Sequence, residues 1–274
     1  MWNCRRNLID SDKKATLKKI EIINFPQKKK LHILCHVEAG LHGATSRHRR
    51  INPLTTRDIH NILGIAGYKL TLPSTWQAHG QARILVISRE ELQIKLHDPG
   101  AQNCDLPTIT CEISLAREKK TILNFFYREF TGGVSGLADL PAQVERLSRQ
   151  ANLWRRLCSG NKDVVCIGDA NLCSKKWNDD NFPQKELAAI TQNFLLETSS
   201  YQIVKEFTRS EVGPGGEIVR SCIDHCYSNS PEKLSVPELI AVGSSDHLGI
   251  VVKKFTKAAK LKPKSFIKGA INSS

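Results

Sequence analysis

The sequence contains no long apolar run. No 18 consecutive residues are apolar, so we expect no membrane-spanning helix and no membrane partner. Residues 1–6 lack the apolar core of a signal peptide. The nine cysteines are an odd number, and Cys35, Cys111 and Cys166 lie inside apolar runs, which is typical of reduced, buried thiols rather than of a disulfide framework. We therefore expect a nuclear or cytoplasmic protein that is not secreted.

Acidic residues are also few. The chain has 27 Asp and Glu against 40 Lys and Arg, which gives a net charge of +13. Basic proteins bind nucleic acid with release of counterions, so a polyanionic partner such as nucleic acid is the natural inference. Charge alone favours this partner only slightly over simple solubility or an anionic membrane surface. The segment 46–56, with its arginines, is expected to be a basic loop.

Apolar residues are nevertheless numerous enough for a core. With 40% hydrophobic residues, 274 residues can form one two-sheet domain or two small ones. The sequence has no internal repeat and no evident linker before its last segment, so we expect one domain over residues 1–256. Lysines among small residues indicate that residues 257–274 are a disordered tail or a linker.

Hydrophobic patterns predict more strands than helices. The predicted helices span residues 13–25, 137–158 and 183–196. The predicted strands span residues 31–37, 83–88, 92–96, 108–115, 120–127, 163–167, 221–227, 236–242 and 248–255. We expect strand 83–88 to form an antiparallel hairpin with 92–96, and 108–115 with 120–127. The apolar stripe of 137–158 fits a helix on a sheet better than a coiled coil. The pattern favours an α/β fold of two packed sheets with helices outside.

Polar side chains follow two of these apolar runs. Asp169 and Asn171 come after strand 163–167, and Asp246 and His247 come after strand 236–242. A hard cation prefers carboxylate oxygens, and a histidine can exchange a proton near neutral pH. These residue types suit a metal-assisted phosphodiesterase. The alternative for each pair is a polar turn at a strand end.

Further candidates lie near other strand ends. Glu38 follows strand 31–37, where it could bind a metal ion or be a solvated loop carboxylate. Asp224 could fix the tautomer of His247 or be a strand-edge surface charge. Tyr127 could donate its hydroxyl group to a phosphate, with Arg128 adding charge, or be a core aromatic residue. A zinc site of Cys222, His225 and Cys226 is a weaker idea because its spacing fits no standard finger.

The order of these residues resembles the endonuclease/exonuclease/phosphatase superfamily over residues 1–256. The superfamily includes apurinic endonucleases, pancreatic-type DNases and the endonuclease domains of non-LTR retrotransposons. The matching motifs are Trp2-Asn3, Glu38, Tyr127-Arg128, Gly168-Asp169-Ala170-Asn171, Ser221-Cys222-Ile223-Asp224 and Ser245-Asp246-His247. The Tyr-Arg pair is most similar to the retrotransposon branch. Ala170 replaces the usual aromatic residue or leucine, and Glu129 stands where a proline often follows Tyr-Arg.

This resemblance implies a four-layer α/β sandwich, with two mostly antiparallel sheets packed face to face and helices outside. It implies that Glu38 is the principal ligand of Mg²⁺, with Mn²⁺ as an alternative. Asn3 would lie near the metal, and Asp246 would support the metal or His247. The further implied roles are water orientation by Asp169, base or transition-state stabilisation by His247 paired with Asp224, and phosphate contacts by Asn171, Tyr127, Arg128 and Ser221.

The leading hypothesis is a Mg²⁺-dependent endonuclease that nicks DNA and needs no small-molecule cofactor. No polymerase motif is present, so a reverse transcriptase encoded downstream is the expected partner in the retrotransposon branch. Two alternatives stay open. The chain could hydrolyse another phosphate ester, such as an inositol phosphate, or it could be an inactive nucleic-acid-binding remnant.

Overall fold

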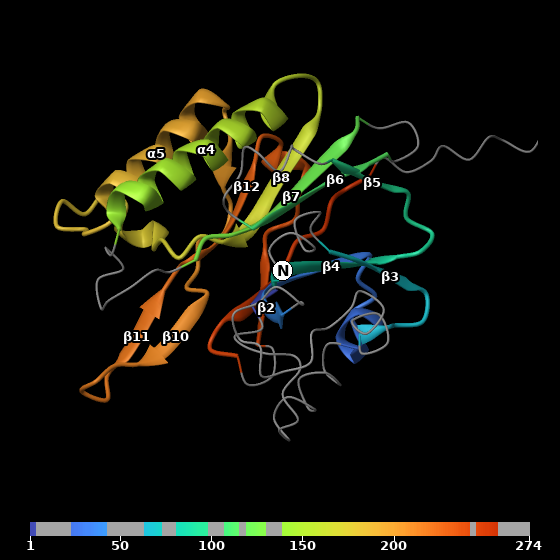
Figure 1. Cartoon of the computed structure of the whole chain (residues 1–274), viewed down its shortest axis with the longest axis horizontal. Helices are drawn as coiled ribbons and strands as arrows, with labels where there is room; N and C mark the ends of the chain where they lie inside the picture. Colours follow the sequence, from blue (N-terminus) through green and yellow to red (C-terminus); the bar gives the residue numbers. More distant parts are fainter. Residues whose placement is uncertain are drawn as a thin grey trace, which may run out of the picture.

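The computed structural model describes residues 1–3, 23–42, 63–72, 81–97, 107–114, 119–129, 139–241 and 245–256. The side chains of residues 2, 3, 38–42, 81 and 82 lie outside this description. Two β-sheets pack against each other, and two long helices cover the outer face of one of them (Figure 1).

The first sheet has the order β1-β2-β4-β3. Its strands are β1 (Trp2–Asn3), β2 (Ile33–His42), β4 (Gln81–Arg89) and β3 (Tyr68–Thr71). β1 is parallel to β2, and the other pairs are antiparallel. The amino group of Met1 donates to Ile250 O at 2.7 Å, and Ile250 N donates to Met1 O at 2.9 Å. These bonds attach the antiparallel pair β13 (Glu238–Ala241) and β14 (Leu248–Val251) beside β1.

The second sheet has the order β5-β6-β7-β8-β12-β9. Its strands are β5 (Ile94–His97), β6 (Thr108–Ile113), β7 (Thr121–Tyr127), β8 (Asp163–Asp169), β12 (Asp224–Ser228) and β9 (Tyr201–Gln202). β7 and β8 are parallel, while the other pairs are antiparallel. A parallel pair needs a crossover connection, and this one contains helix α4 (Leu140–Cys158).

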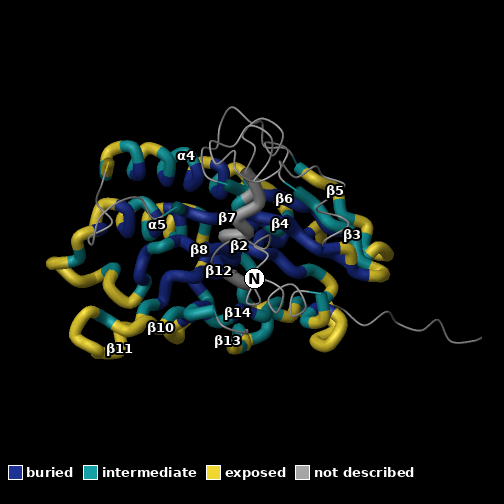
Figure 2. Tube along the Cα trace, turned by 60° about the horizontal axis from the view of Figure 1, so that its bottom comes forward, coloured by how far each residue is buried: buried dark blue, intermediate teal, exposed yellow. Residues whose placement is uncertain are grey.

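α4 and α5 (Lys185–Glu197) cover the outer face of the second sheet (Figure 1). Trp154 of α4 packs edge-on against Phe126 of β7 and Tyr227 of β12, with Phe194 of α5 beside it. All four aromatic side chains are buried. Every residue of β8 is buried, since helices lie on one face and the first sheet on the other (Figure 2).

The other face of the second sheet packs against the first sheet. Alternation along the strands sends Phe125, Val165 and Ile167 into this inter-sheet core, where they cluster with Val37 and Ile84. The same alternation sends Tyr127, Asp169 and Asp224 toward the first sheet, at the end of the core. The fold therefore places these polar side chains at the edge of the apolar core between the two sheets.

Shorter elements complete the described structure. Two 3₁₀ turns span Ser174–Lys176 (η1) and Pro231–Lys233 (η2). β10 (Arg209–Val212) and β11 (Ile218–Ser221) form a hairpin that projects from the body of the molecule (Figure 1). Among the described helices, none is both long and apolar enough to cross a membrane.

The predicted four-layer α/β sandwich is confirmed, with mostly antiparallel sheets face to face and helices outside. The hairpin of 108–115 with 120–127 is confirmed as β6–β7, and helix 137–158 lies on a sheet as α4. The described cysteines, which exclude Cys4 and Cys104, are free thiols, as expected. The predicted tail, residues 257–274, and basic loop, residues 46–56, lie outside the described residues.

The predicted hairpin of 83–88 with 92–96 is wrong. β4 pairs with β2 and β3 in the first sheet, whereas β5 is the edge strand of the second. Residues 84–88 are buried throughout, so this strand needs a partner on each side, which a simple hairpin does not supply. A short turn between two strand-like runs does not reveal that they enter different sheets.

Three predicted boundaries also change. The described helical residues 23–28 continue through Pro26, where we predicted the helix to end. β2 continues to His42 instead of ending before Glu38. The predicted strand 221–227 is split between β11 and β12 at residues 222–223, whose backbone oxygens accept hydrogen bonds from Ser174 N and Ala170 N.

Candidate active site

Three polar side chains form a row across neighbouring strands of the second sheet. Tyr127 at the end of β7 is in register with Asp169 at the end of β8, and Asp169 is in register with Asp224 at the start of β12. All three are buried. Because opposite residues of adjacent strands point to the same face, sheet pairing alone gathers them.

Gly168 allows this close arrangement. A Cβ atom on Gly168 would lie 2.0 Å from Phe126 O on the neighbouring strand β7. Only glycine fits that approach without moving the backbone. The glycine of the Gly-Asp-x-Asn motif therefore sets the position of β8, and with it the position of Asp169.

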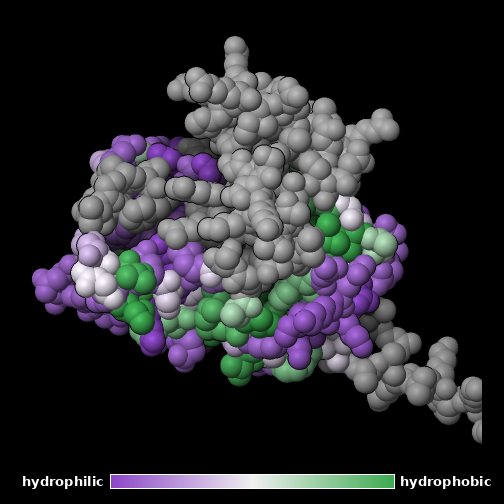
Figure 3. All heavy atoms as spheres, turned by 90° about the horizontal axis from the view of Figure 1, so that it is seen from below, coloured by the Kyte–Doolittle hydropathy of each residue, from purple (hydrophilic) through white to green (hydrophobic). Residues whose placement is uncertain are grey.

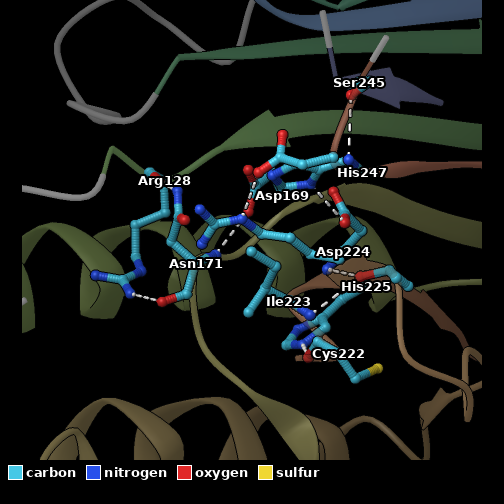
Figure 4. A network of polar contacts seen from close by, with 12 residues as sticks. Arg128, Asp169, Asn171, Cys222, Ile223, Asp224, His225, Ser245 and His247 are labelled. Atoms are coloured by element: carbon cyan, nitrogen blue, oxygen red, sulfur yellow. Dashed lines mark hydrogen bonds and ion pairs between the residues drawn. The ribbon is translucent and has the colours of Figure 1, made fainter. Parts of the chain in front are cut away.

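His247 completes the cluster from the segment before β14. Its Nδ1–H donates to Asp224 Oδ2 at 2.9 Å, since a carboxylate oxygen can only accept. One possible ligand atom from each of Asp169, Asp224 and His247 lies within 4.8 Å of the others. Figure 4 shows the three side chains turned toward one another. The structure thus joins the Gly-Asp-x-Asn motif and the Ser-Asp-His motif at one place.

The surroundings of His247 favour its charged form. Burial lowers the pKa of this imidazole, but the Asp224 hydrogen bond and the charges of Asp224, Asp169 and Asp246 outweigh burial and raise the pKa to about 9. In the protein without a bound cation, His247 is therefore an imidazolium at neutral pH. It can donate a hydrogen bond through Nε2 while Nδ1 stays on Asp224.

Thr208 supports Asp224 and was missed by sequence reasoning. Its hydroxyl oxygen accepts hydrogen bonds from Ile223 N at 3.2 Å and Asp224 N at 3.1 Å, and the residue is fully buried. These bonds hold the backbone where β12 begins. A lone threonine outside any strand-end motif carries no sequence signal for this role.

The loop after β8 has a left-handed backbone at Asn171, with a φ of 46°, a conformation that asparagine adopts more readily than most residues other than glycine. Asn171 N donates to Asp169 Oδ1 at 2.8 Å, and Asn171 Nδ2 donates to Arg128 O at 2.7 Å. The loop also contacts the residue that precedes β12, because Ala170 N donates to Ile223 O at 2.8 Å. Asp169 and Asn171 are therefore fixed relative to each other.

Arg128, which we predicted to contact a phosphate, lies inside the protein. The residue is 3% exposed, and its guanidinium donates to Ala170 O and Asn171 O, each at 2.5 Å, and to Gln143 Oε1 at 2.7 Å. Burial lowers the pKa of Arg128 to about 10, so it remains charged at neutral pH. Figure 4 shows this side chain turned toward the Asn171 backbone. Its contacts hold the loop that carries Asp169 and Asn171.

Asp246 lies beside the β10–β11 hairpin, and Ser221 is the last residue of that hairpin. Asp246 Oδ2 accepts a hydrogen bond from Arg209 Nε at 2.9 Å. Ser221 ends β11 in register with Arg209 and is partly exposed. This oxygen of Asp246 therefore pairs with a cation of the protein.

Asn3 and Glu38 approach each other through the first sheet. Asn3 of β1 is in parallel register with Val37 of β2, the residue before Glu38. Glu38 lies inside β2, where the pairing with β4 shifts register between Val37 and Leu41. The side chains of Asn3 and Glu38 lie outside the described residues. Their roles as metal ligands stay predictions.

The predicted zinc site of Cys222, His225 and Cys226 is wrong. His225 Nε2–H donates to Cys222 O at 3.2 Å, and His225 Nδ1 accepts from the Tyr227 hydroxyl at 2.5 Å, so both ring nitrogens are occupied. Burial lowers the pKa of His225 to about 4. Cys226 lies in the inter-sheet core.

The donors near His247 suit a hard divalent cation. Asp169 and Asp224 contribute carboxylate oxygens, the ligand type that Mg²⁺ prefers. Asp224 Oδ1 is buried and, among the described residues, has no hydrogen-bond partner. A buried carboxylate oxygen in this state favours a nearby cation or a bound water. Among the described residues, no other group of three or more acidic, His or Cys side chains could hold a metal ion.

Comparison with known proteins gives matches at the level of structure. No family model and no curated protein matches the sequence. The AP endonuclease LMAP from Leishmania major is 14% identical, with a TM-score of 0.71 over 93% of this chain and 86% of that chain. The endonuclease domain of TRAS1, a telomere-specific non-LTR retrotransposon, is 15% identical, with a TM-score of 0.57 over 88% of this chain and 94% of that one.

A third similar structure is an endonuclease/exonuclease/phosphatase family protein from Leptotrichia buccalis. It is 12% identical, with a TM-score of 0.60 over 93% of this chain and 98% of that chain. Identities this low establish the fold and leave the substrate open. The chain therefore has the fold of the endonuclease/exonuclease/phosphatase superfamily, in agreement with the resemblance of its motifs.

Proposed function

We propose that the chain is a Mg²⁺-dependent endonuclease domain that nicks DNA. The observation that carries the proposal is the buried His247–Asp224 pair, which lies beside Asp169 at the end of the inter-sheet core. A carboxylate-held imidazole next to a second carboxylate can orient water and stabilise charge on a phosphate. The net charge of +13 supports a polyanionic substrate.

In this proposal Glu38 is the principal metal ligand, with Asn3 beside it. Mn²⁺ is an alternative ion, since it also accepts oxygen ligands. When bound, the ion neutralises charge on the phosphate. We assign Asp246 to the support of His247, because one of its oxygens already accepts a hydrogen bond from Arg209.

The described side chains divide the remaining work. Asp169 accepts a hydrogen bond from the attacking water and aligns it with the phosphorus. The Tyr127 hydroxyl and the second amide hydrogen of Asn171 donate to phosphate oxygens. His247, oriented by its hydrogen bond to Asp224, donates through Nε2–H to the phosphate oxygen that gains negative charge. The water oxygen bonds to phosphorus while the bond between phosphorus and the 3′ oxygen breaks. The proton of the water passes to Asp169, and the leaving 3′ oxygen takes a proton from solvent, so the products are a 5′-phosphate and a free 3′-hydroxyl group.

Arg128 has a different proposed role from the one its sequence position indicates. Its buried guanidinium holds the backbone of Ala170 and Asn171. We assign it to the positioning of the Asp169–Asn171 loop. Ser221 is left as a phosphate contact, because it ends β11 close in sequence to Asp224 and is partly exposed.

We further propose that the domain spans residues 1–256 and belongs to a retrotransposon, with a reverse transcriptase encoded downstream. The support is the Tyr127-Arg128 pair and the structural likeness to the TRAS1 endonuclease domain. The lysine-rich residues 257–274 would then be a linker. Activity on DNA in this setting implies a nuclear or cytoplasmic site of action.

Nicking of supercoiled plasmid DNA, compared with phosphate release from an inositol polyphosphate, tests the substrate. We expect Mg²⁺-dependent nicking with no release from the inositol ester. Release from the ester without nicking would replace DNA with a small phosphate ester. Plasmid binding with neither reaction would identify an inactive nucleic-acid-binding remnant.

A further inference from the structure

The base of the β10–β11 hairpin contains an arginine between two carboxylates. Arg209 Nε donates to Asp246 Oδ2 at 2.9 Å, and Arg209 Nη2 donates to Glu211 Oε2 at 2.5 Å. The side chains of Arg209 and Asp246 are 19% and 17% exposed, so this pair is largely shielded from solvent. Shielding makes an ion pair stronger and less sensitive to salt than a surface pair.

The backbone of Arg209 also pairs with the catalytic segment. Arg209 and His247 form an antiparallel bridge. Ser210 N donates to Asp246 O at 3.0 Å, and Leu248 N donates to Thr208 O at 2.7 Å. The start of β10 is therefore the strand neighbour of residues 246–248. A change in the direction of the hairpin has to move the His247 backbone or break these bonds.

The far end of the same hairpin is exposed. Val212 and Ile218 are in register, and their exposed fractions are 73% and 65%. Figure 3 shows apolar surface on the side of the molecule where the hairpin projects. One short hairpin thus joins an exposed tip to the backbone of His247.

Arg209 is poorly suited to bind a phosphate itself. Two carboxylates surround one guanidinium, so the local net charge is negative and repels an anion. Its nitrogens Nε and Nη2 already donate to these carboxylates. Arg220 differs, because it is exposed and lies on the opposite face of the hairpin, in register with Ser210.

We propose that Arg209 is a positioning residue for His247. It fixes Asp246 through the ion pair, and it fixes His247 through the backbone bridge, so that the imidazole stays in line with Asp224. The inference rests on the proposed endonuclease function for its kinetic consequence. Its structural part, the coupling of the hairpin to residues 246–248, stands without that function.

The kinetic test compares Arg209→Met with Arg220→Met on supercoiled plasmid in Mg²⁺. Displacement of a catalytic group lowers the rate of the chemical step more than it weakens substrate binding. We therefore expect kcat of Arg209→Met to fall roughly tenfold or more, while KM changes less than about twofold. The matched control Arg220→Met should keep its kcat. Arg209→Lys restores the charge without the planar fork and should recover only part of the rate. A rise in KM without a fall in kcat for Arg209→Met would assign it to DNA binding and overturn the proposal.

The second test needs no activity and uses the metal-free protein. Amide hydrogen exchange of Ser210 and Leu248 reports the bonds between β10 and residues 246–248. We expect exchange at both amides to be roughly tenfold faster in Arg209→Met and unchanged in Arg220→Met. A double variant, Arg209→Met with Asp246→Asn, should exchange no faster than Arg209→Met alone, because both changes remove one interaction.

The two tests separate failure of this inference from failure of the proposed function. Unchanged exchange in Arg209→Met would overturn the positioning role even if the wild-type protein nicks DNA. Faster exchange in Arg209→Met, together with no nicking by the wild-type protein, would reject the endonuclease function and keep the structural coupling.

Discussion

The imidazole Nδ1 of His247 lies 2.9 Å from Asp224 Oδ2, and this bond joins the two sheets of the fold at the candidate active site. Asp224 begins β12 of the second sheet. His247 precedes β14, which the bonds between Met1 and Ile250 attach to the first sheet. Both residues are buried, with exposed fractions of 4% for His247 and 0% for Asp224. The pair therefore depends on correct assembly of the whole sandwich.

Replacement of Asp224 tests the tautomer of His247. In Asp224→Asn the amide oxygen accepts only weakly, and the amide nitrogen can donate to Nδ1 and stabilise the wrong tautomer. We expect kcat for nicking to fall by about 10³–10⁴, with far-UV circular dichroism unchanged. Loss of less than tenfold in a folded variant would contradict the role of this pair.

The pKa of His247 can be measured directly in the metal-free protein. Nuclear magnetic resonance of the imidazole protons should give a value near 9 in the wild type. In Asp224→Asn the value should fall, because burial then acts with less opposition. A wild-type value at or below the ordinary 6.5 would be inconsistent with the described contacts.

The same shift predicts how stability depends on pH. The folded state binds the His247 proton more tightly than the unfolded state, so the stabilisation is fully present below about pH 6.5. It is lost as the pH rises through about 9. The difference in unfolding free energy between wild type and His247→Gln should therefore shrink from pH 6 to pH 10 in urea titrations. A difference that grows with pH would refute the sign.

Arg128 can be tested through its helix partner. Gln143→Leu removes one acceptor of the Arg128 guanidinium. Gln150→Leu is the control, because it removes another buried glutamine of α4 that contacts Asn124 instead. Both changes should cost similar stability, about 1–2 kcal/mol. Only Gln143→Leu should lower kcat, because it loosens the Asp169–Asn171 loop. Equal kcat values for the two variants would leave Arg128 with a purely structural role.

Asp163 should stabilise the fold at the opposite end of β8 from the candidate active site. Its carboxylate accepts from Lys233 Nζ and Lys254 Nζ, each at 2.6 Å. Burial opposes the charge, but the two lysines outweigh burial and lower the pKa of Asp163 to about 2. At pH 7, Asp163→Asn should lower the unfolding free energy by roughly 1–3 kcal/mol and leave kcat unchanged.

The control for Asp163 is an exposed ion pair. Asp180 lies on the surface and pairs with Lys185 at 3.0 Å. Asp180→Asn should change stability by less than about 0.5 kcal/mol, because water already screens such a pair. Thermal or urea unfolding of the two variants side by side would show whether burial makes this difference.

The sequence is informative where a residue pattern reflects one local cause. The short apolar runs in 120–127 and 163–167 predict β7 and β8, because strands buried on both faces are apolar along their length. The apolar stripe of 137–158 predicts α4, because a helix buried on one face repeats its apolar residues every three or four positions. The motif order also predicts that Asp169, Asp224 and His247 meet. Asp224 lies beside Asp169 in the sheet, as that prediction requires.

Long-range contacts limit what the sequence can predict. Arg128 follows a tyrosine that the motif assigns to phosphate binding. Its guanidinium nevertheless faces the interior, because it donates to the backbone oxygens of Ala170 and Asn171, which are 42 and 43 positions later in the sequence. Thr208 and Arg209 carry no motif, and their importance comes from β10 lying against residues 246–248. The sequence predicts a hairpin for β4 and β5, because no residue pattern in either strand indicates that the two strands belong to different sheets.

The central claim is that Asp169 and His247 form a working phosphodiesterase site, and plasmid nicking tests it most directly. Wild-type protein, Asp169→Ala and His247→Ala would be compared on supercoiled plasmid with Mg²⁺ and with EDTA, after circular dichroism shows equal folding. We predict nicking by the wild type in Mg²⁺ alone and none by either variant. Nicking that persists in a folded variant, or in EDTA, would contradict the claim.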